Sequence, residues 1–122
     1  MFWFLFFTKH LIVDFLLQTP FQYKNKGKFL HIGGLIHTFL HGLATFIIVS
    51  CLVNFQAGLY TGLFDMICHY LIDFAKVNID KRFKWSELKE NCRVVYSNNH
   101  YISIGFDQYL HCLTYLIIFY SL

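Results

Sequence analysis

The sequence predicts an all-α protein, an integral membrane bundle of four transmembrane helices that forms a single domain over residues 1–122. Composition is the first observation: 57% of the 122 residues are hydrophobic, 20% are aromatic and only 14% are charged, with a mean hydropathy of +0.48. A soluble domain of this length rarely carries so little charge. The second observation is a series of apolar runs, and the third is that His and Asp recur inside these runs at intervals of four residues.

The first apolar run, residues 2–17, is short for a membrane span, which needs about 20 residues. It has no basic segment before it and no small-residue cleavage site after it, so we do not interpret it as a signal peptide. Pro20 ends this helix because proline cannot continue it. Residues 21–28 then carry three lysines and are expected to form a basic loop.

The second apolar run, residues 29–53, is long enough to cross a bilayer, and the third covers residues 57–77. Only residues 54–56 separate the two runs, so the two helices are expected to form an antiparallel hairpin. Glycines in both runs, including Gly42 and Gly62, would allow the two backbones to approach each other closely.

The segment 78–100 differs in kind because it is polar and rich in charge. Within it, residues 85–90 predict a short amphipathic helix on the cytoplasmic side, with Trp85 at the level of the lipid headgroups. Residues 97–99 are typical of a turn. The last apolar run, residues 101–122, supplies the fourth span.

Lysines and arginines in the loops orient the predicted bundle. The first and third loops are basic, whereas the second loop and both ends of the chain carry no lysine or arginine. By the positive-inside rule, the basic loops face the cytoplasm of an inner (cytoplasmic) membrane, and both termini lie outside the cytoplasm.

Charge and cysteine content exclude other classes of protein. The net charge of +3 arises in the loops and does not indicate a nucleic-acid partner. The four cysteines show no CxxC spacing and three lie in apolar runs, so we expect small buried hydrophobic residues rather than a disulfide framework. The expected partners are the lipid bilayer and a lipid-linked or membrane-associated substrate, and a homo-oligomer is left open.

The third run carries Asp65, His69 and Asp73 four residues apart, a spacing that places all three on one face of a helix. Ionisable groups inside a membrane are costly and by default functional. Counted from the cytoplasmic end of each span, the polar residues of all four spans lie in one layer, roughly 5 to 17 Å deep. The other spans carry the pairs His10–Asp14, His37–His41 and Asp107–His111.

Two ligands at positions i and i+4 of a rigid helix can bind one metal ion from the same side. Imidazole nitrogen and carboxylate oxygen suit a divalent metal, with zinc as the first choice and iron or manganese as alternatives. The helical hairpin supplies the first candidates, because its short connection fixes its two helices best. The predicted metal ligands are His37, His41, Asp65 and His69, with His10, Asp107 and His111 completing the shell or forming a second metal position.

Two further carboxylates, Asp14 and Asp73, lie nearest the cytoplasmic end of their spans and are candidate general bases. Asp14 is also a candidate for completing the metal shell. Lysines at this end could hold an anionic head group. The residues expected to contact the substrate there are Gln18, Lys26, Lys76 and Gln108.

Other interpretations of the polar residues stay open. They could satisfy one another in a structural hydrogen-bond network, or form a path for protons or ions. A haem held by two imidazoles fits less well, because carboxylates would lie against an apolar macrocycle. The segment 78–100 could instead bind a host protein, as in a phage or bacterial membrane factor. Lys9 either extends outward or neutralises a carboxylate, and His31 and His100 are expected to be surface residues.

The polar residues follow one another in the order His10-x3-Asp14-Phe15-x2-Gln18, Lys26, His37 and His41, His69-x3-Asp73-x2-Lys76, and Asp107-Gln108-x2-His111. This order resembles the domain-of-unknown-function family 3307, a family of small bacterial and phage membrane proteins, over nearly the whole chain. The resemblance implies no established activity. A second, distant similarity to membrane-bound metal-dependent hydrolases implies a hydrolase by analogy. The function predicted is metal-dependent hydrolysis of a lipid or membrane-associated substrate.

Overall fold

The computed structural model describes residues 1–85, 88–90, 93–95 and 97–122, and the described chain is helical except for loops and one small hairpin. Two short strands, β1 (Leu88–Glu90) and β2 (Arg93–Val95), pair in antiparallel register. The prediction of a helical fold is confirmed. The helices are α1 (Phe2–Leu11), the π-helix η1 (Ile12–Leu17), α2 (Pro20–Asn25), α3 (Ile32–Leu52), α4 (Phe55–Arg82) and α5 (Asn98–Ser121).

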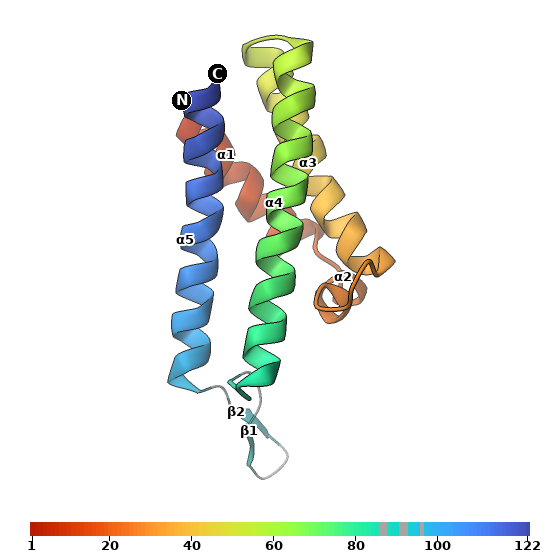
Figure 1. Ribbon diagram of the computed structural model, residues 1–122, viewed down its shortest axis with the longest axis vertical. Coiled ribbons are helices and arrows are strands. Elements are labelled where there is room, and N and C mark those ends of the chain that lie inside the picture. Colours follow the sequence, from red (N-terminus) through yellow and green to blue (C-terminus); the bar gives the residue numbers. More distant parts are fainter. Residues whose placement is uncertain (86–87, 91–92, 96) are drawn as a thin grey trace.

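The long helices α3, α4 and α5 run along the length of the molecule, and α1 crosses behind them obliquely (Figure 1). Both termini and the α3–α4 turn lie at one end, called the terminal end below, and the β1–β2 hairpin lies at the opposite end, the hairpin end (Figure 1). Helices α3 and α4 form an antiparallel pair with extensive mutual contact, as the short connection predicted. Helix α2 packs against α3.

Helix α2 occupies part of the segment expected to be a basic loop, so that prediction is wrong for residues 21–25. The Thr19 hydroxyl accepts a hydrogen bond from the Gln22 backbone N–H at 3.3 Å, and Gln22 Oε1 accepts one from the Thr19 backbone N–H at 2.9 Å. This reciprocal capping box begins a helix, and Pro20 suits its first position because its N–H is not needed there.

Helix α4 continues to Arg82, beyond the end of the apolar run that predicted it. The amphipathic helix expected over residues 85–90 is wrong for residues 88–90, which form β1; residues 86 and 87 lie outside the described residues. The turn expected at residues 97–99 is the start of α5, where the Ser97 side chain accepts a hydrogen bond from the His100 backbone N–H.

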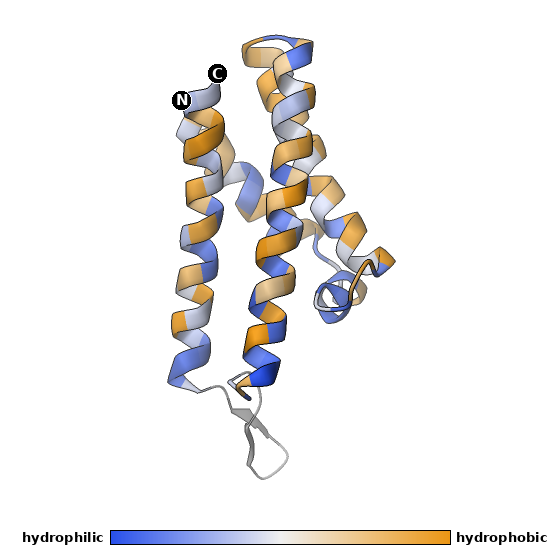
Figure 2. Ribbon diagram, viewed as in Figure 1, coloured by the Kyte–Doolittle hydropathy of each residue, from blue (hydrophilic) through white to orange (hydrophobic). Residues whose placement is uncertain are grey.

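Among the helices that the structure describes, α3 and α5 are long and apolar enough to cross a membrane. Helix α4 is longer than either, but the Asp65, His69 and Asp73 side chains lower its mean hydropathy. Figure 2 shows the resulting alternation of hydrophobic and hydrophilic residues along α4.

Helix α4 carries apolar side chains on its outside and polar side chains inside. Leu63, Ile67 and Leu71 are 48%, 55% and 57% exposed, whereas Asp65 and His69 are each 1% exposed. A protein surrounded by water normally shows the reverse, because burying an ionisable group costs more than burying an apolar one. Polar groups inside and apolar groups outside are expected where the surroundings are themselves apolar.

The interior changes from polar to apolar toward the terminal end. Phe6 of α1 packs edge-on against Tyr115 of α5, with ring centroids 5.1 Å apart. Val49 of α3 and Ile118 of α5 complete this group, and all four side chains are at most 1% exposed. We call these four residues the apolar layer; it closes the interior on the side of the chain termini.

Gly42 and Gly62 lie where α3 and α4 come closest. A Cβ atom placed on Gly42 would lie 2.7 Å from the Gly62 carbonyl oxygen, and one on Gly62 would lie 2.8 Å from the Gly42 carbonyl oxygen. Real Cβ atoms do not approach backbone so closely, so any larger residue would force the two helices apart. Glycine here allows the close approach that was expected from the sequence.

The substitution Gly62→Val should therefore separate α3 from α4 and lower the free energy of unfolding by about 1–3 kcal/mol, the usual cost of overpacking. Unfolding of the purified protein in mixed micelles by sodium dodecyl sulfate measures this change. Gly105→Val is the matched control, because a Cβ at Gly105 has no atom within 4 Å and the substitution makes the same change in helix propensity. Equal effects of the two substitutions would show that helix contact is not the reason for the glycine.

Candidate metal centre

Four imidazole rings, from α1, α3 and α5, gather around the His69 ring of α4. The His69 ring stacks on His41 with centroids 3.5 Å apart and on His111 with centroids 4.1 Å apart. The rings of His37 and His10 lie 5.1 and 5.7 Å from His69. The prediction that polar residues of separate helices meet at one level is confirmed for these histidines.

Asp14, in the π-helix η1, contacts three of these imidazoles. Its Oδ1 lies 3.2 Å from His37 Nε2 and 3.0 Å from His41 Nε2, and its Oδ2 lies 2.9 Å from His10 Nε2. The sequence suggested Asp14 as a general base or a further ligand. The structure places its carboxylate among the ring nitrogens themselves, within 3.2 Å of three of them.

Asp73 of α4 makes a similar set of contacts on the other side of His69. Its Oδ2 lies 3.2 Å from His37 Nε2 and 3.7 Å from His69 Nε2, and its Oδ1 lies 3.8 Å from His111 Nε2. The same Oδ1 accepts a hydrogen bond from Lys26 Nζ at 3.3 Å. Asp73 therefore lies between the histidine cluster and a lysine near the hairpin end.

Two groups of side chains offer ligand atoms that lie within 4.8 Å of one another. They share His69, which is 1% exposed and whose two ring nitrogens have no hydrogen-bond partner within the described part of the chain. A buried polar atom without a partner is costly, and a metal ion would satisfy it. The first group is Asp14, His37, His41 and His69, and the second group is His69, Asp73 and His111.

Asp65 was predicted as a ligand, but the structure places it in neither group. Its Oδ2 is paired with Lys9 Nζ and accepts a hydrogen bond from the Thr45 hydroxyl at 2.6 Å. Lys9 Nζ also lies 4.8 Å from the centre of the Tyr115 ring and 3.5 Å from His41 Nδ1. Of the two alternatives for Lys9, the structure shows the second: it neutralises a carboxylate.

His10 and Asp107 lie at the edge of the cluster rather than in the two donor groups. His10 Nδ1 lies 2.7 Å from the Tyr115 hydroxyl, and its Nε2 lies 3.1 Å from Gln108 Oε1. Asp107 Oδ1 lies 3.7 Å from His111 Nε2 and makes no hydrogen bond to a described residue. Gln108, expected to contact substrate, instead holds an imidazole.

Gln18 and Lys26 lie beside the cluster toward α2. Gln18 Nε2 is 3.2 Å from His37 Nδ1, and Lys26 Nζ is 3.3 Å from Asp73 Oδ1. Burial alone would lower the pKa of Lys26, but the charges of Asp73 and Asp14 outweigh burial and raise it above its ordinary value. Lys26 is therefore a cation next to the second donor group.

Lys76, which the sequence placed in one substrate-binding mouth with Lys26, pairs with a different carboxylate. Its Nζ is 3.2 Å from Asp80 Oδ2, and Asp80 also accepts a hydrogen bond from the Ser103 hydroxyl at 2.6 Å. This second polar cluster joins α4 to α5 nearer the hairpin end.

Sequence reasoning missed this cluster because residues 78–100 were read as a loop. His100 was expected at the surface, but it is 6% exposed and its Nδ1 lies 2.9 Å from Asp80 Oδ2. A helix that continued past Asp73 would have placed Asp80 on the same face two turns later, and that spacing was the available signal. His31, the other histidine expected at the surface, caps α3 by accepting a hydrogen bond from the Gly33 backbone N–H at 3.1 Å.

The chain matches the model of one protein family over residues 2–122, and that family is described as "Protein of unknown function (DUF3307)". No curated protein matches the chain. No solved structure matches it either.

The pairing of Lys9 with Asp65 predicts a large effect of Lys9→Met, which removes the cation but keeps a side chain of similar length. The buried Asp65 carboxylate would lose its charge partner, so the free energy of unfolding should fall by about 3–5 kcal/mol. Unfolding of the purified protein by sodium dodecyl sulfate measures this change in the free energy of unfolding.

The double variant Lys9→Met/Asp65→Leu is the control for that substitution, because it leaves no unpaired charge and should recover more than half of the lost stability. A loss below about 1 kcal/mol for Lys9→Met, the range of exposed ion pairs, would contradict the description of this pair as buried and necessary.

Proposed function

We propose that this chain, which belongs to the DUF3307 family of unknown function, is a membrane-embedded metal-binding protein that acts as a metal-dependent hydrolase on a lipid or membrane-associated substrate. The observation that carries the proposal is His69. This imidazole is surrounded by four others, is 1% exposed, and has two ring nitrogens without a hydrogen-bond partner in the described residues. A metal ion is the simplest group that would use such nitrogens.

The proposal places four helical segments across the membrane: α1 with η1, α3, α4 and α5. Support comes from the polar interior and the exposed apolar side chains of these helices. Basic residues lie in α2 and in the last turn of α4, both nearer the hairpin end than the terminal end (Figure 1). By the positive-inside rule the hairpin end faces the cytoplasm of the inner membrane, and both termini lie on the other side.

The first donor group is the best candidate for holding the ion. Three imidazoles and one carboxylate form a ligand set that suits zinc, and iron or manganese would also accept it. Tetrahedral zinc, with metal–ligand distances of about 2.0–2.1 Å, separates its ligands by about 3.4 Å. The ligand atoms lie within 4.8 Å of one another, so side-chain adjustments without movement of the helices would bring them to that separation.

The second donor group supplies the remaining chemistry. A metal ion held by three of the four donors of the first group would keep one coordination position for water, and it would polarise an ester or phosphoryl oxygen and activate that water as a nucleophile. Asp73 is suited to accept a proton, because its carboxylate lies beside both His69 and His111. Lys26, paired with Asp73, would hold an anionic group at the cytoplasmic side of the site.

Proton or ion conduction is the second candidate, and the stacked rings of His111, His69 and His41 favour it. A conducting path must, however, reach both sides of the membrane. The apolar layer lies between these rings and the terminal end, and its four side chains are at most 1% exposed. A path from these rings to the terminal end would have to pass these four side chains, so we favour catalysis over conduction.

Metal analysis of detergent-purified protein tests the proposal most directly. The wild-type chain should carry about one divalent ion, and His69→Ala and His37→Ala should each carry nearly none, because each removes a ligand of the first donor group. His31→Ser is the control, since it removes a histidine outside the cluster and keeps a side chain that can cap α3. Metal-free wild-type protein, or equal loss in His31→Ser, would overturn the metal site.

Activity and conduction are separated in one preparation of liposomes that contain the metal-loaded protein. Hydrolysis predicts the release of a product from the liposome lipids that stops with a chelator and in Asp73→Asn. Conduction predicts a change in a trapped pH-sensitive dye when a proton gradient is applied. Proton flux without product release would contradict the hydrolase and support a conducting function.

A further inference from the structure

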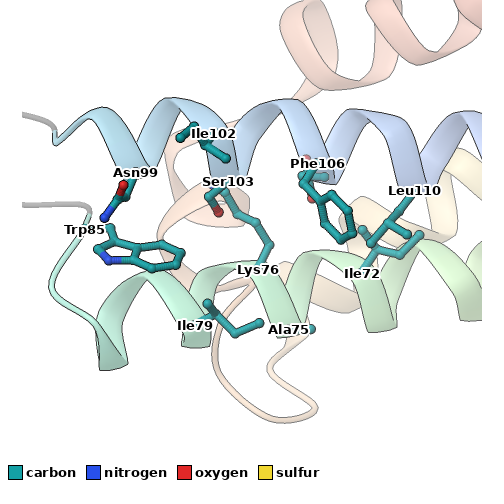
Figure 3. Close-up of a pocket in the computed structure, with 11 residues that line it drawn as sticks. Ile72, Ala75, Lys76, Ile79, Trp85, Asn99, Ile102, Ser103, Phe106 and Leu110 are labelled. Carbon is teal, nitrogen blue, oxygen red and sulfur yellow. The ribbon is translucent and has the colours of Figure 1, made fainter.

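A groove runs between α4 and α5 on the outside of the molecule, near the hairpin end. It encloses about 390 Å³, within the range of small-molecule binding sites. Figure 3 shows Trp85 and Asn99 at one end of the groove and Ile72, Phe106 and Leu110 at the other. The side chains that line the groove therefore change along its length, from amphipathic and polar at the Trp85 end to apolar at the other end.

The end of the groove that holds Trp85 is cationic. Lys76 lines the groove beside it, and Lys81, Arg82 and Lys84, at the end of α4 and just beyond it, are exposed. The one acidic residue in this stretch, Asp80, is 2% exposed and pairs with Lys76 at 3.2 Å, so the positive charge that it leaves at the surface is that of Lys81, Arg82 and Lys84. An anionic group is the natural occupant of this end.

The other end of the groove is bounded by side chains that are themselves exposed and apolar. Phe106, at this end, is 62% exposed, and Ile102, nearer to Asn99 and Trp85, is 69% exposed; both lie on the face of α5 that lines the groove (Figure 3). In a membrane-spanning bundle this face meets lipid, so the groove opens sideways toward the acyl chains. An apolar chain would fill this end without leaving a polar group unpaired.

The groove also reaches the residues beside the proposed metal centre. Asp107 lines the groove, and its Oδ1, which makes no hydrogen bond to a described residue, lies 3.7 Å from His111 Nε2. His111 belongs to the second donor group. A molecule in the groove would therefore lie next to the donor cluster without passing through the interior of the bundle.

We propose that this groove binds a phospholipid with an anionic headgroup, taken from the surrounding leaflet. Its phosphate lies near Lys76 and Trp85, and one acyl chain lies along Ile72, Phe106 and Leu110. The inference rests on the membrane placement given under the proposed function, and it names the substrate class and the direction from which the substrate reaches the donor cluster. Binding in the groove itself needs no metal.

Native mass spectrometry of the detergent-purified chain tests this, with palmitoyl-oleoyl phosphatidylglycerol and phosphatidylcholine as the two probes. The wild-type chain should retain one phosphatidylglycerol in preference to phosphatidylcholine. Lys76→Gln should reduce that preference about fivefold, the effect expected for one basic residue near a lipid headgroup. Asp80 keeps Ser103 and His100 as partners in this variant, so folding should be retained.

Ala75→Trp fills the groove and should weaken phosphatidylglycerol binding at least about tenfold, because the acyl chain loses its place. Leu71→Trp is the matched control: it adds the same ring to α4, at an exposed residue that lines a different surface. Equal retention of the two lipids by the wild-type chain, or equal effects of the two tryptophan substitutions, would overturn the groove as the lipid site.

The metal content of each sample, measured in parallel, distinguishes the two proposals. Binding of phosphatidylglycerol in the groove by a chain that carries no metal would support the lipid site and contradict the hydrolase proposal. A chain that carries metal but shows no preference between the two lipids would support the metal centre and contradict the lipid site.

Discussion

The structure depends on two carboxylates that hold several imidazoles together inside an apolar exterior. Asp14 contacts His10, His37 and His41, and Asp73 contacts His37 and His69, so each carboxylate links side chains of different helices. In apolar surroundings no water replaces such contacts, and removing one partner leaves a buried charge. A displacement of one residue along any of these helices turns a ligand by about 100°. The polar centre therefore fixes how the helices pack, as well as what they can bind.

Much of this centre was predictable because helix geometry is regular. Residues four apart lie on one face, so the pairs His37–His41 and His69–Asp73 were correctly expected to point the same way. Alternating helix direction then brought the polar residues of separate helices to one level. The short connection between α3 and α4 and their close approach at Gly42 also followed from sequence.

What the sequence could not show was the choice of partner within that layer. Asp65 has the same spacing to His69 as Asp73 has, yet it pairs with Lys9, a residue of α1 that lies 56 positions earlier. Spacing identifies a face of a helix but not which neighbouring helix packs on it. The cluster at His100 was hidden for another reason: α4 extends to Arg82, past the point where its apolar pattern ends.

The apolar layer has a consequence for how the centre would be supplied. Phe6, Val49, Tyr115 and Ile118 lie between His69 and the chain termini, so an ion entering from the terminal end would have to pass four buried apolar side chains. Loading and loss of a bound ion would then follow the composition of one compartment alone. With the orientation and the metal proposed above, a chelator confined to the opposite compartment would leave the centre untouched, and the protein would respond to the metal status of the cytoplasm rather than to that of its outer surroundings.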